Sequence, residues 1–231
     1  MTALLEAIDL HTFYGASHVL HGVSFSIAEG ETVTLMGRNG MGKTTTIRSV
    51  LGLTPPRSGE VRVRGRAVTS WPAHRIAAQG IALVPEGRGI FPTLTVSENL
   101  RVAQQSGRWT EDRALALFPR LRERLSHLGS QLSGGEQQML AIARALLLNP
   151  SLVILDGATE GLAPLIRQEI WAAVRQLRAD GIASLIVDKE VKTLLQIGDR
   201  HLIILKGRIV FSGDSAGFRA RAEENLALLR A

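Results

Sequence analysis

The residues best suited to chemistry begin with a glycine-rich stretch at positions 37–44. It reads Gly-Arg-Asn-Gly-Met-Gly-Lys-Thr and fits the phosphate-binding pattern G-x-x-x-x-G-K-S/T. Its glycines allow successive backbone N–H groups to point inward at a helix N-terminus, where they bind an anion. Lys43 is then expected to reach the β- and γ-phosphates of a nucleotide, and Thr44 to offer its hydroxyl to Mg²⁺. The expected nucleotide-binding residues here are Gly37, Arg38, Asn39, Gly40, Met41, Gly42, Lys43, Thr44 and Thr45.

The segments on either side are the ones that such a loop needs. Residues 31–36 are β-branched and apolar enough for a strand, and residues 44–51 predict a helix that ends at Gly52. A glycine-rich turn that only caps a helix is the other interpretation. Strand, loop and helix follow in the order that a phosphate loop requires, which favours nucleotide binding.

A second candidate anion site begins at Ser133. Residues 132–146 read Leu-Ser-Gly-Gly-Glu-Gln-Gln-Met-Leu-Ala-Ile-Ala-Arg-Ala-Leu, so a hydroxyl and two glycines precede a strong helix. The N–H groups and the positive end of the helix dipole can meet an anion there. Serine also caps helices routinely, and the residues alone leave both interpretations open.

Two carboxylates follow apolar runs that predict buried parallel strands. Glu86 comes after residues 81–84 and a proline, and Asp156 ends the run 152–156. Ligands of α/β sheets gather at the carboxyl ends of the strands, where Asp156 suits Mg²⁺ and Glu86 can orient water or Mg²⁺. A single Glu in a loop is more often only solvated. The expected metal ligands are Thr44, Glu86 and Asp156.

Tyr14 is the only tyrosine and lies between two expected strands, residues 4–10 and 19–27. Its ring either stacks on a nucleobase or covers a strand edge. Beyond the phosphate loop, strands and helices alternate, which predicts an α/β core with right-handed parallel crossovers. The other expected elements are strands at 61–65, 182–187, 201–205 and 208–211, helices at 72–79, 165–178 and 191–197, and two or three amphipathic helices within 96–128.

Composition indicates one sizeable core in 231 residues, of which 45% are hydrophobic. The absence of cysteine excludes disulfides and thiolate metal sites. No signal segment and no apolar run of about 18 residues is seen, so we expect a soluble, cytoplasmic chain. The net charge of +6 suits nucleic acid, an anionic membrane surface or an ordinary solvated surface.

The phosphate loop, the segment 132–138 and the strand ending in Asp156 occur in an order that resembles the ATP-binding subunit of an ABC transporter. The resemblance covers almost the whole chain. Residues 84–88, 91–100 and 160–164 are most similar to the branched-chain amino acid importer branch, which includes relatives for urea and short amides. It implies an α/β P-loop NTPase fold of ABC type, with a mixed sheet core, antiparallel β decoration and a helical subdomain.

In domain terms, the resemblance implies a single ATP-binding domain. Residues 1–94 and 132–231 would form the RecA-like core with its β decoration, and residues 95–131 the helical subdomain. Tyr14 would stack on the adenine of ATP, which binds with Mg²⁺. Two such domains dimerise head to tail, as a homodimer or a heterodimer, so that a signature segment meets the partner's nucleotide. The signature residues are Ser133, Gly134, Gly135 and Glu136.

The same resemblance implies transmembrane permease subunits as partners, contacted by the helical subdomain, and indirectly a solute-binding protein. The chain would then be cytoplasmic and peripheral on the inner face of the cell membrane. This location at the membrane would account for the basic residues on its surface.

Two departures from the family pattern stand out. The catalytic Glu expected directly after Asp156 is replaced by Gly157, and Lys189 occupies the place of a histidine. We interpret Glu160 as part of the loop that faces the partner, which makes Glu86 the better candidate to orient water. Because a positioned base contributes about 10²- to 10⁴-fold, hydrolysis at this chain's own site is expected to be weakened.

Three functions are therefore compared. The first is an ATP-hydrolysing subunit that drives an importer of branched-chain amino acids or related small solutes. The second is a gating subunit with a slow site that relies on a partner's intact site, which Gly157 favours. The third is a DNA-associated ATPase; because no long coiled-coil insertion precedes the signature, no nucleic-acid partner is expected.

Overall fold

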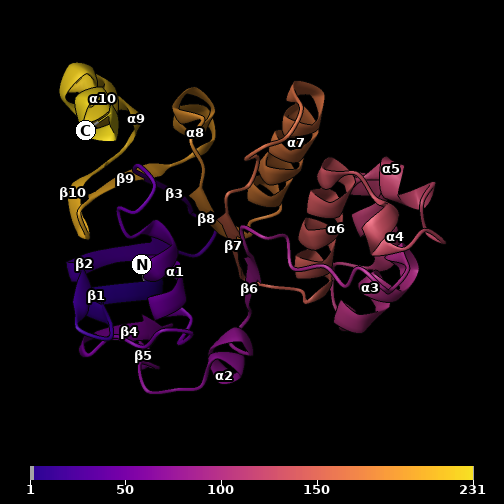
Figure 1. Ribbon diagram of the computed structural model, residues 1–231, viewed down its shortest axis with the longest axis horizontal. Coiled ribbons are helices and arrows are strands. Elements are labelled where there is room, and N and C mark those ends of the chain that lie inside the picture. Colours follow the sequence, from indigo (N-terminus) through magenta and orange to yellow (C-terminus); the bar gives the residue numbers. More distant parts are fainter. Residues whose placement is uncertain (1–2, 231) are drawn as a thin grey trace.

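The computed structural model describes residues 3–230 and contains two β-sheets flanked by helices (Figure 1). One sheet has six strands in the order β10-β9-β3-β8-β7-β6, and the other has four in the order β2-β1-β4-β5. In the larger sheet β9 and β10 pair antiparallel, and the other neighbours pair parallel. This arrangement confirms the expected α/β class, with a mixed core sheet and antiparallel decoration.

The six-stranded sheet is the element that positions the chemistry. Its strands are β3 (Thr32–Met36), β6 (Ile81–Val84), β7 (Leu152–Asp156), β8 (Ala183–Val187), β9 (Arg200–Leu205) and β10 (Arg208–Gly213). Every residue of β3, β7 and β8 is buried. Continuous apolar runs of this kind form central parallel strands because both faces are covered.

The four-stranded sheet is antiparallel and extends beyond the strands expected from the sequence. It contains β1 (Ala3–Tyr14), β2 (Ser17–Ala28), β4 (Ser58–Val63) and β5 (Arg66–Ala67). The ladder between β1 and β2 runs from the Ala3–Ala28 pair to the Tyr14–Ser17 pair. Apolar residues of β1, β2 and β4 pack against β3 and against the helices at residues 43–50 and 73–77. Together they form one of the two hydrophobic cores.

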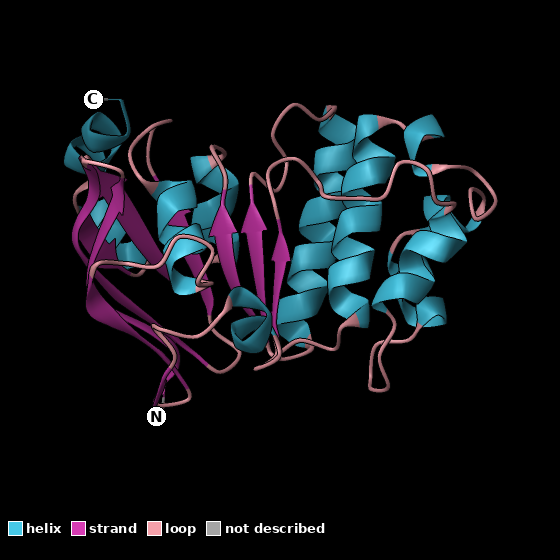
Figure 2. Cartoon of the chain, turned by 60° about the horizontal axis from the view of Figure 1, so that its bottom comes forward, coloured by secondary structure: helices cyan, strands magenta, loops and turns pink. Residues whose placement is uncertain are grey.

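Helices cover the parallel sheet and form a block at one edge of it (Figure 2). They are α1 (Lys43–Val50), α2 (Ala73–Ala77), α3 (Val96–Ala103), α4 (Glu111–Leu117), α5 (Pro119–Arg122), α6 (Gly134–Leu147), α7 (Pro164–Ala179), α8 (Val191–Ile197), α9 (Ser215–Ala220), α10 (Ala222–Arg230) and a 3₁₀ turn, η1 (Gly129–Gln131). The second core contains residues of α3 to α8 and the sheet face beneath them. The expected helices within 96–128 are thus α3, α4 and α5, whereas α9 and α10 were not among the predicted elements.

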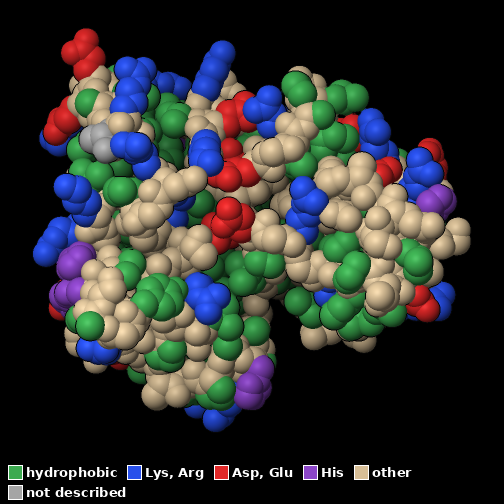
Figure 3. Space-filling model, viewed as in Figure 1, with side chains coloured by type: hydrophobic (Ala, Val, Ile, Leu, Met, Phe, Trp, Pro, Cys, Tyr) green, Lys and Arg blue, Asp and Glu red, His purple; other side chains and the backbone are tan. Residues whose placement is uncertain are grey.

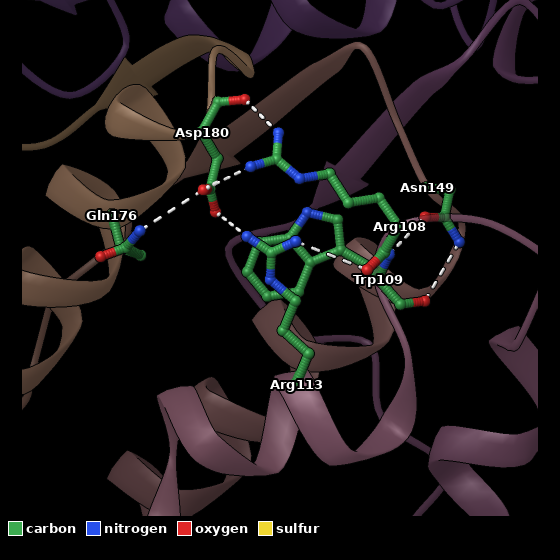
Figure 4. A network of polar contacts seen from close by, with 6 residues as sticks. All are labelled: Arg108, Trp109, Arg113, Asn149, Gln176 and Asp180. Atoms are coloured by element: carbon green, nitrogen blue, oxygen red, sulfur yellow. Dashed lines mark hydrogen bonds and ion pairs between the residues drawn. The ribbon is translucent and has the colours of Figure 1, made fainter.

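The segment that carries α3 to α5 is fastened to the end of α7 through Asp180 (Figure 4). This side chain is only 6% exposed and accepts from Arg108 at 3.0 Å and from Arg113 at 2.6 Å. The backbone carbonyl of Asp180 also accepts from Arg108, at 2.8 Å. Two guanidinium groups from one segment therefore share one buried carboxylate of another.

Replacing Asp180 with alanine is expected to lower the free energy of unfolding by about 2 kcal/mol, because hydrogen bonds to a charged, buried group are lost together. Urea titration followed by circular dichroism measures the loss. Asp112→Ala is the matched control, since Asp112 is 89% exposed and pairs with Arg122 at 3.3 Å. An exposed pair contributes up to about 1 kcal/mol, so equal losses in the two variants would contradict a structural role for the Asp180 contacts.

His201 is a buried titratable group that joins β9 to its neighbours. Its Nδ1 lies 2.8 Å from the hydroxyl of Thr34 on β3, and its Nε2 lies 2.7 Å from the hydroxyl of Ser215 in α9. Burial lowers the pKa of His201 from 6.5 to about 4. The imidazole is therefore neutral in the folded chain at pH values where the unfolded chain already binds a proton.

This lowered pKa predicts that stability falls as the pH drops below 6.5 and that the loss continues down to about pH 4. Between pH 7 and pH 4.5 the cost is about 2 kcal/mol. Denaturant titrations of the native chain and of His201→Gln across this pH range isolate the contribution of His201 to the free energy of unfolding, because both proteins share all other titrating groups. Parallel pH profiles for the two proteins would contradict it.

Candidate functional site

Four loops meet at the carboxyl edge of the parallel sheet, after β3, β8, β7 and β6, which are adjacent in that order. A cavity of about 280 Å³ lies among them. It is lined by Val19, Asn39, Gly40, Gly42, Lys43, Thr44, Thr45, Glu86, Asp156, Gly157, Glu160 and Val187. Figure 3, viewed from the same side as Figure 1, shows acidic side chains near the middle of the visible face, with Lys and Arg side chains around them. The sheet therefore brings the predicted phosphate loop and both predicted carboxylates into one cavity.

The phosphate loop runs from β3 into α1 and holds Lys43 inside the protein. A Cβ on Gly37 would lie 2.5 Å from the carbonyl oxygen of Ile204, so the loop packs too closely there for another residue. The buried Lys43 ammonium donates to the carbonyls of Gly37 and Arg38, both at 2.8 Å. Burial lowers the pKa of Lys43, while the negative charges of Glu160 and Asp156 oppose that shift. A cation and N–H groups at a helix N-terminus form a site for phosphate.

Thr44 and Asp156 form the part of the cavity suited to a divalent cation. The two side chains are hydrogen-bonded, and Asp156 is buried at the end of β7. Burial raises the pKa of Asp156, the hydrogen bond from Thr44 opposes this, and the nearby charge of Glu86 adds to it. Within residues 3–230 no three or more His, Cys, Asp or Glu side chains are spaced to hold a metal alone. The Thr44 hydroxyl and the Asp156 carboxylate fit Mg²⁺, because this ion is usually held by one or two carboxylates together with phosphate oxygens and water.

Tyr14 lies at the end of β1, half-exposed, and is not among the residues that line the cavity. Burial disfavours ionisation of its hydroxyl, but hydrogen bonds with Thr54 and Thr45 and the charge of Arg48 outweigh this and lower its pKa. These contacts place the tyrosine beside α1, directly after the phosphate loop.

The signature segment forms the N-terminus of α6, away from this cavity. Ser133 and Glu136 make a capping box, in which the backbone N–H of Glu136 donates to Ser133 Oγ at 3.3 Å and that of Ser133 donates to the carboxylate at 2.8 Å. The helix-cap interpretation of Ser133 is thus confirmed. No signature residue is among those that line the cavity of the same chain.

Lys189 and Glu160 come from neighbouring loops and form an ion pair. Lys189 Nζ lies 3.2 Å from Glu160 Oε1. Glu160, which the sequence interpretation placed in the loop facing a partner, lines this chain's own cavity. Glu86 lines it as well, as expected. Lys189 lines a neighbouring cavity against the phosphate loop.

Two further residues organise the site and were missed in the sequence. Asp188 is buried after β8 and accepts from Thr159 of the adjacent loop. Arg88 donates to Gln137 of α6 at 2.7 Å, which joins the loop of Glu86 to the signature helix. Asp188 carried the same signal as Asp156, a carboxylate directly after an apolar run. Nothing local to Arg88 indicates its partner, which lies 49 residues away.

Among the residues that the structure describes, no helix combines the length and apolarity needed to cross a membrane. The family model described as "ABC transporter" matches residues 20–160, which include the phosphate loop, the signature and Asp156.

Known proteins similar to the chain are named as ATP-binding proteins or subunits of transport systems. The high-affinity branched-chain amino acid transport ATP-binding protein BraG of Pseudomonas aeruginosa is 41% identical, over 92% of this chain and 94% of that protein. The probable branched-chain amino acid transport ATP-binding protein LivF of Archaeoglobus fulgidus is 35% identical, over 91% and 92%. A solved ATP-binding subunit of an ABC transporter superposes with a TM-score of 0.87 at 31% identity, covering 99% of this chain and all of the other. The chain therefore belongs to the ABC transporter family, as one of its ATP-binding, ATP-hydrolysing subunits.

Proposed function

We propose that this chain powers the import of branched-chain amino acids or chemically related small solutes. Support comes from the two relatives of 41% and 35% identity, both of which are named for branched-chain amino acid transport. The main observation in support of ATP as the energy source is the cavity in which Lys43, Thr44 and Asp156 meet. Urea and short amides are the related solutes that the sequence resemblance includes.

In this cavity the phosphates of ATP would lie on the loop of residues 37–45, with Lys43 directed to the β- and γ-phosphates. Tyr14, which is already held beside α1, would stack on the adenine. Thr44 and Asp156 would hold Mg²⁺, with Glu86 close enough to complete its shell or orient water. Bound Mg²⁺ would neutralise charge that develops on the phosphates. Lys189, the other candidate catalytic residue, would neutralise charge from the β8 side.

The signature segment would serve a partner's nucleotide in a head-to-tail dimer. This proposal is supported by the position of Ser133, Gly134, Gly135 and Glu136 at the N-terminus of α6, outside the lining of the chain's own cavity. A Cβ on Gly134 would lie 2.8 Å from the guanidinium of Arg88, whose loop also carries Glu86. Binding of the partner's nucleotide at the signature would therefore affect the Glu86 loop of the same chain.

The permease subunits would dock beside the helical subdomain, residues 95–131. Exposed apolar side chains occur there and on the adjoining core, namely Phe91, Val102 and Leu148. A groove between the two parts is lined in part by Val102, Leu148 and Arg144. Apolar surface rimmed by polar groups favours a protein partner. The permease would hold the chain on the cytoplasmic, inner face of the cell membrane, and a solute-binding protein would act through the permease.

A gating subunit that relies on a partner's intact site is the second candidate function. The observation that favours it is Gly157, where a carboxylate would ordinarily activate water. In that case ATP would close the dimer while the other subunit hydrolyses its own nucleotide.

Uptake by cells tests the proposed function. Deleting the gene in its native host is expected to abolish ATP-dependent uptake of labelled leucine, isoleucine or valine. The wild-type chain should restore it, and Lys43→Ala should not. Uptake of glucose is the control for general damage. Unchanged uptake of all three amino acids, with loss of urea or short-amide uptake instead, would move the solute to that class, and no change in any of them would contradict an import function.

A further inference from the structure

Residue 157 lacks a side chain, and two neighbouring carboxylates occupy the space around it. A Cβ built on Gly157 would lie 3.5 Å from Cγ of Glu86, and 3.8 and 3.9 Å from Cγ and Cδ of Glu160. Glu86 approaches this space with its methylene, whereas Glu160 brings its carboxyl carbon. Both side chains therefore border the space beside residue 157, and of these three atoms only Cδ of Glu160 belongs to a carboxyl group.

The backbone of Gly157 explains why Glu160 reaches that far. Its φ of +69° lies in the left-handed region, which glycine adopts without strain. The chain then turns so that the N–H of Glu160 donates to the carbonyl of Gly157 at 3.4 Å. This turn brings residue 160 back over the end of β7, toward the cavity that it lines.

Asp188 fastens the turn to the neighbouring loop. Its Oδ2 accepts from both the N–H and the hydroxyl of Thr159 at 2.8 Å. Its Oδ1 accepts from the N–H groups of Lys189 and Glu190, at 2.7 and 3.0 Å. Because the Asp188 side chain is buried, the backbones that carry Glu160 and Lys189 are held by one carboxylate.

The ion pair with Lys189 leaves part of the Glu160 carboxylate available. Lys189 Nζ contacts Oε1 at 3.2 Å. With 29% of the Glu160 side chain exposed, water can reach it. Among the charges that raise the pKa of Lys43, that of Glu160 is the strongest, which agrees with a carboxylate directed at the phosphate loop.

We propose that Glu160 replaces the missing carboxylate of residue 157 by orienting the hydrolytic water and accepting its proton. As the water oxygen bonds to the γ-phosphorus, the bond from that phosphorus to the β–γ bridging oxygen breaks and its electron pair stays with ADP. The proton passes to Glu160, and the products are ADP and inorganic phosphate. Asp188 is a positioning residue, and Lys189, besides neutralising charge, holds the Glu160 carboxylate through their ion pair. The inference rests on the proposed function, since it requires MgATP in this cavity.

Glu160→Gln in the full-length purified chain tests the assignment. The expected result is a kcat lower by about 10²- to 10⁴-fold, with the dissociation constant for MgATP within about twofold of wild type. Light scattering gives a readout independent of turnover, because the MgATP-dependent dimer should persist in the variant and decay in the wild type. Glu169→Gln is the matched control: Glu169 pairs with Arg120 at 3.0 Å, its side chain is 31% exposed, and its loss should leave kcat unchanged.

Two companion variants separate a catalytic role from a structural one. Glu160→Ala should regain part of its turnover on addition of formate, since a small free carboxylate can take the place of the lost one. Gly157→Ala should lower kcat about tenfold without changing any charge, because alanine disfavours the positive φ that turns Glu160 inward. No recovery with formate together with a normal kcat in Gly157→Ala would overturn the assignment.

The outcomes also distinguish this inference from the function on which it rests. A kcat within about threefold of wild type in Glu160→Gln, or a larger loss in Glu86→Gln, would overturn the assignment of the water to Glu160. A wild-type chain that binds MgATP and dimerises without turnover would also overturn it, while leaving ATP-driven gating intact. Failure of the wild-type chain to bind MgATP at all would refute the proposed function itself.

Discussion

Lys43→Ala is expected to weaken MgATP binding by about 100- to 1,000-fold and to remove measurable turnover. Lys43 is buried and its ammonium already points into the phosphate loop, where it donates to the carbonyls of Gly37 and Arg38. Losing one member of a buried charge pair costs about 3–5 kcal/mol, and the lower part of this interval, about 3–4 kcal/mol, corresponds to that range of dissociation constants. The negative charge of the phosphates would then face Asp156 and Glu160 without the opposing cation.

Titration with a fluorescent ATP analogue in the presence of Mg²⁺ measures this loss. Lys192→Ala is a suitable control, because Lys192 is exposed on α8 and its removal changes the net charge equally. The control should bind as the wild type does. Equal affinities in Lys43→Ala and in the wild type would show that the loop of residues 37–44 does not hold the phosphates.

Asp156→Asn is expected to lower turnover by about 1,000-fold, because Mg²⁺ neutralises several kcal/mol of charge development in the transition state. Binding of ATP in EDTA should stay close to that of the wild type, whereas the gain on adding Mg²⁺ should disappear. Burial already raises the pKa of Asp156, so a neutral isostere removes a charge that the fold accommodates at a cost. The melting temperature without nucleotide should therefore be unchanged or higher.

Asp112→Asn serves as the control for Asp156, since its carboxylate is exposed. It should retain the Mg²⁺ effect on affinity and full turnover. If Asp156→Asn kept the Mg²⁺-dependent gain in ATP affinity, the metal would have to be held by other residues, and the role given to β7 would be wrong.

Much of the fold was accessible from local pattern, because buried parallel strands are short apolar runs and their ends are marked by polar residues. The predicted strand 81–84 and the predicted helix 191–197 coincide with β6 and α8. β1 and β2 extend past their predicted ends, since cross-strand pairing continues to the Tyr14–Ser17 pair. Periodicity does not reveal how far such pairing continues.

The C-terminal helices α9 and α10 were missed although a local signal existed. Asp214 caps α9 by accepting from the N–H of Gly217 at 2.7 Å, and aspartate before a helix is a common start signal. What secures the helix is tertiary: Phe218 is buried and its ring lies edge-on to Phe211, 5.6 Å between centroids. A contact of that kind has no signature in a single sequence.

The direction of Glu160 was the part of the site that the sequence did not predict. It depends on a positive φ at Gly157 and on Asp188, which binds Thr159 from 29 residues away. A glycine in place of a carboxylate indicates a lost group, and only the geometry shows a second carboxylate in the space beside it. Residues 37–45, Glu86 and Asp156 could be named as candidates from the sequence because each lies at or just after the end of a strand.

Steady-state turnover of MgATP by the purified wild-type chain, with Lys43→Ala measured in parallel, tests the central claim that this chain binds and hydrolyses ATP in its own cavity. We predict saturable turnover that requires Mg²⁺ and disappears in the variant. Tight MgATP binding with a wild-type rate no higher than that of Lys43→Ala would contradict the claim.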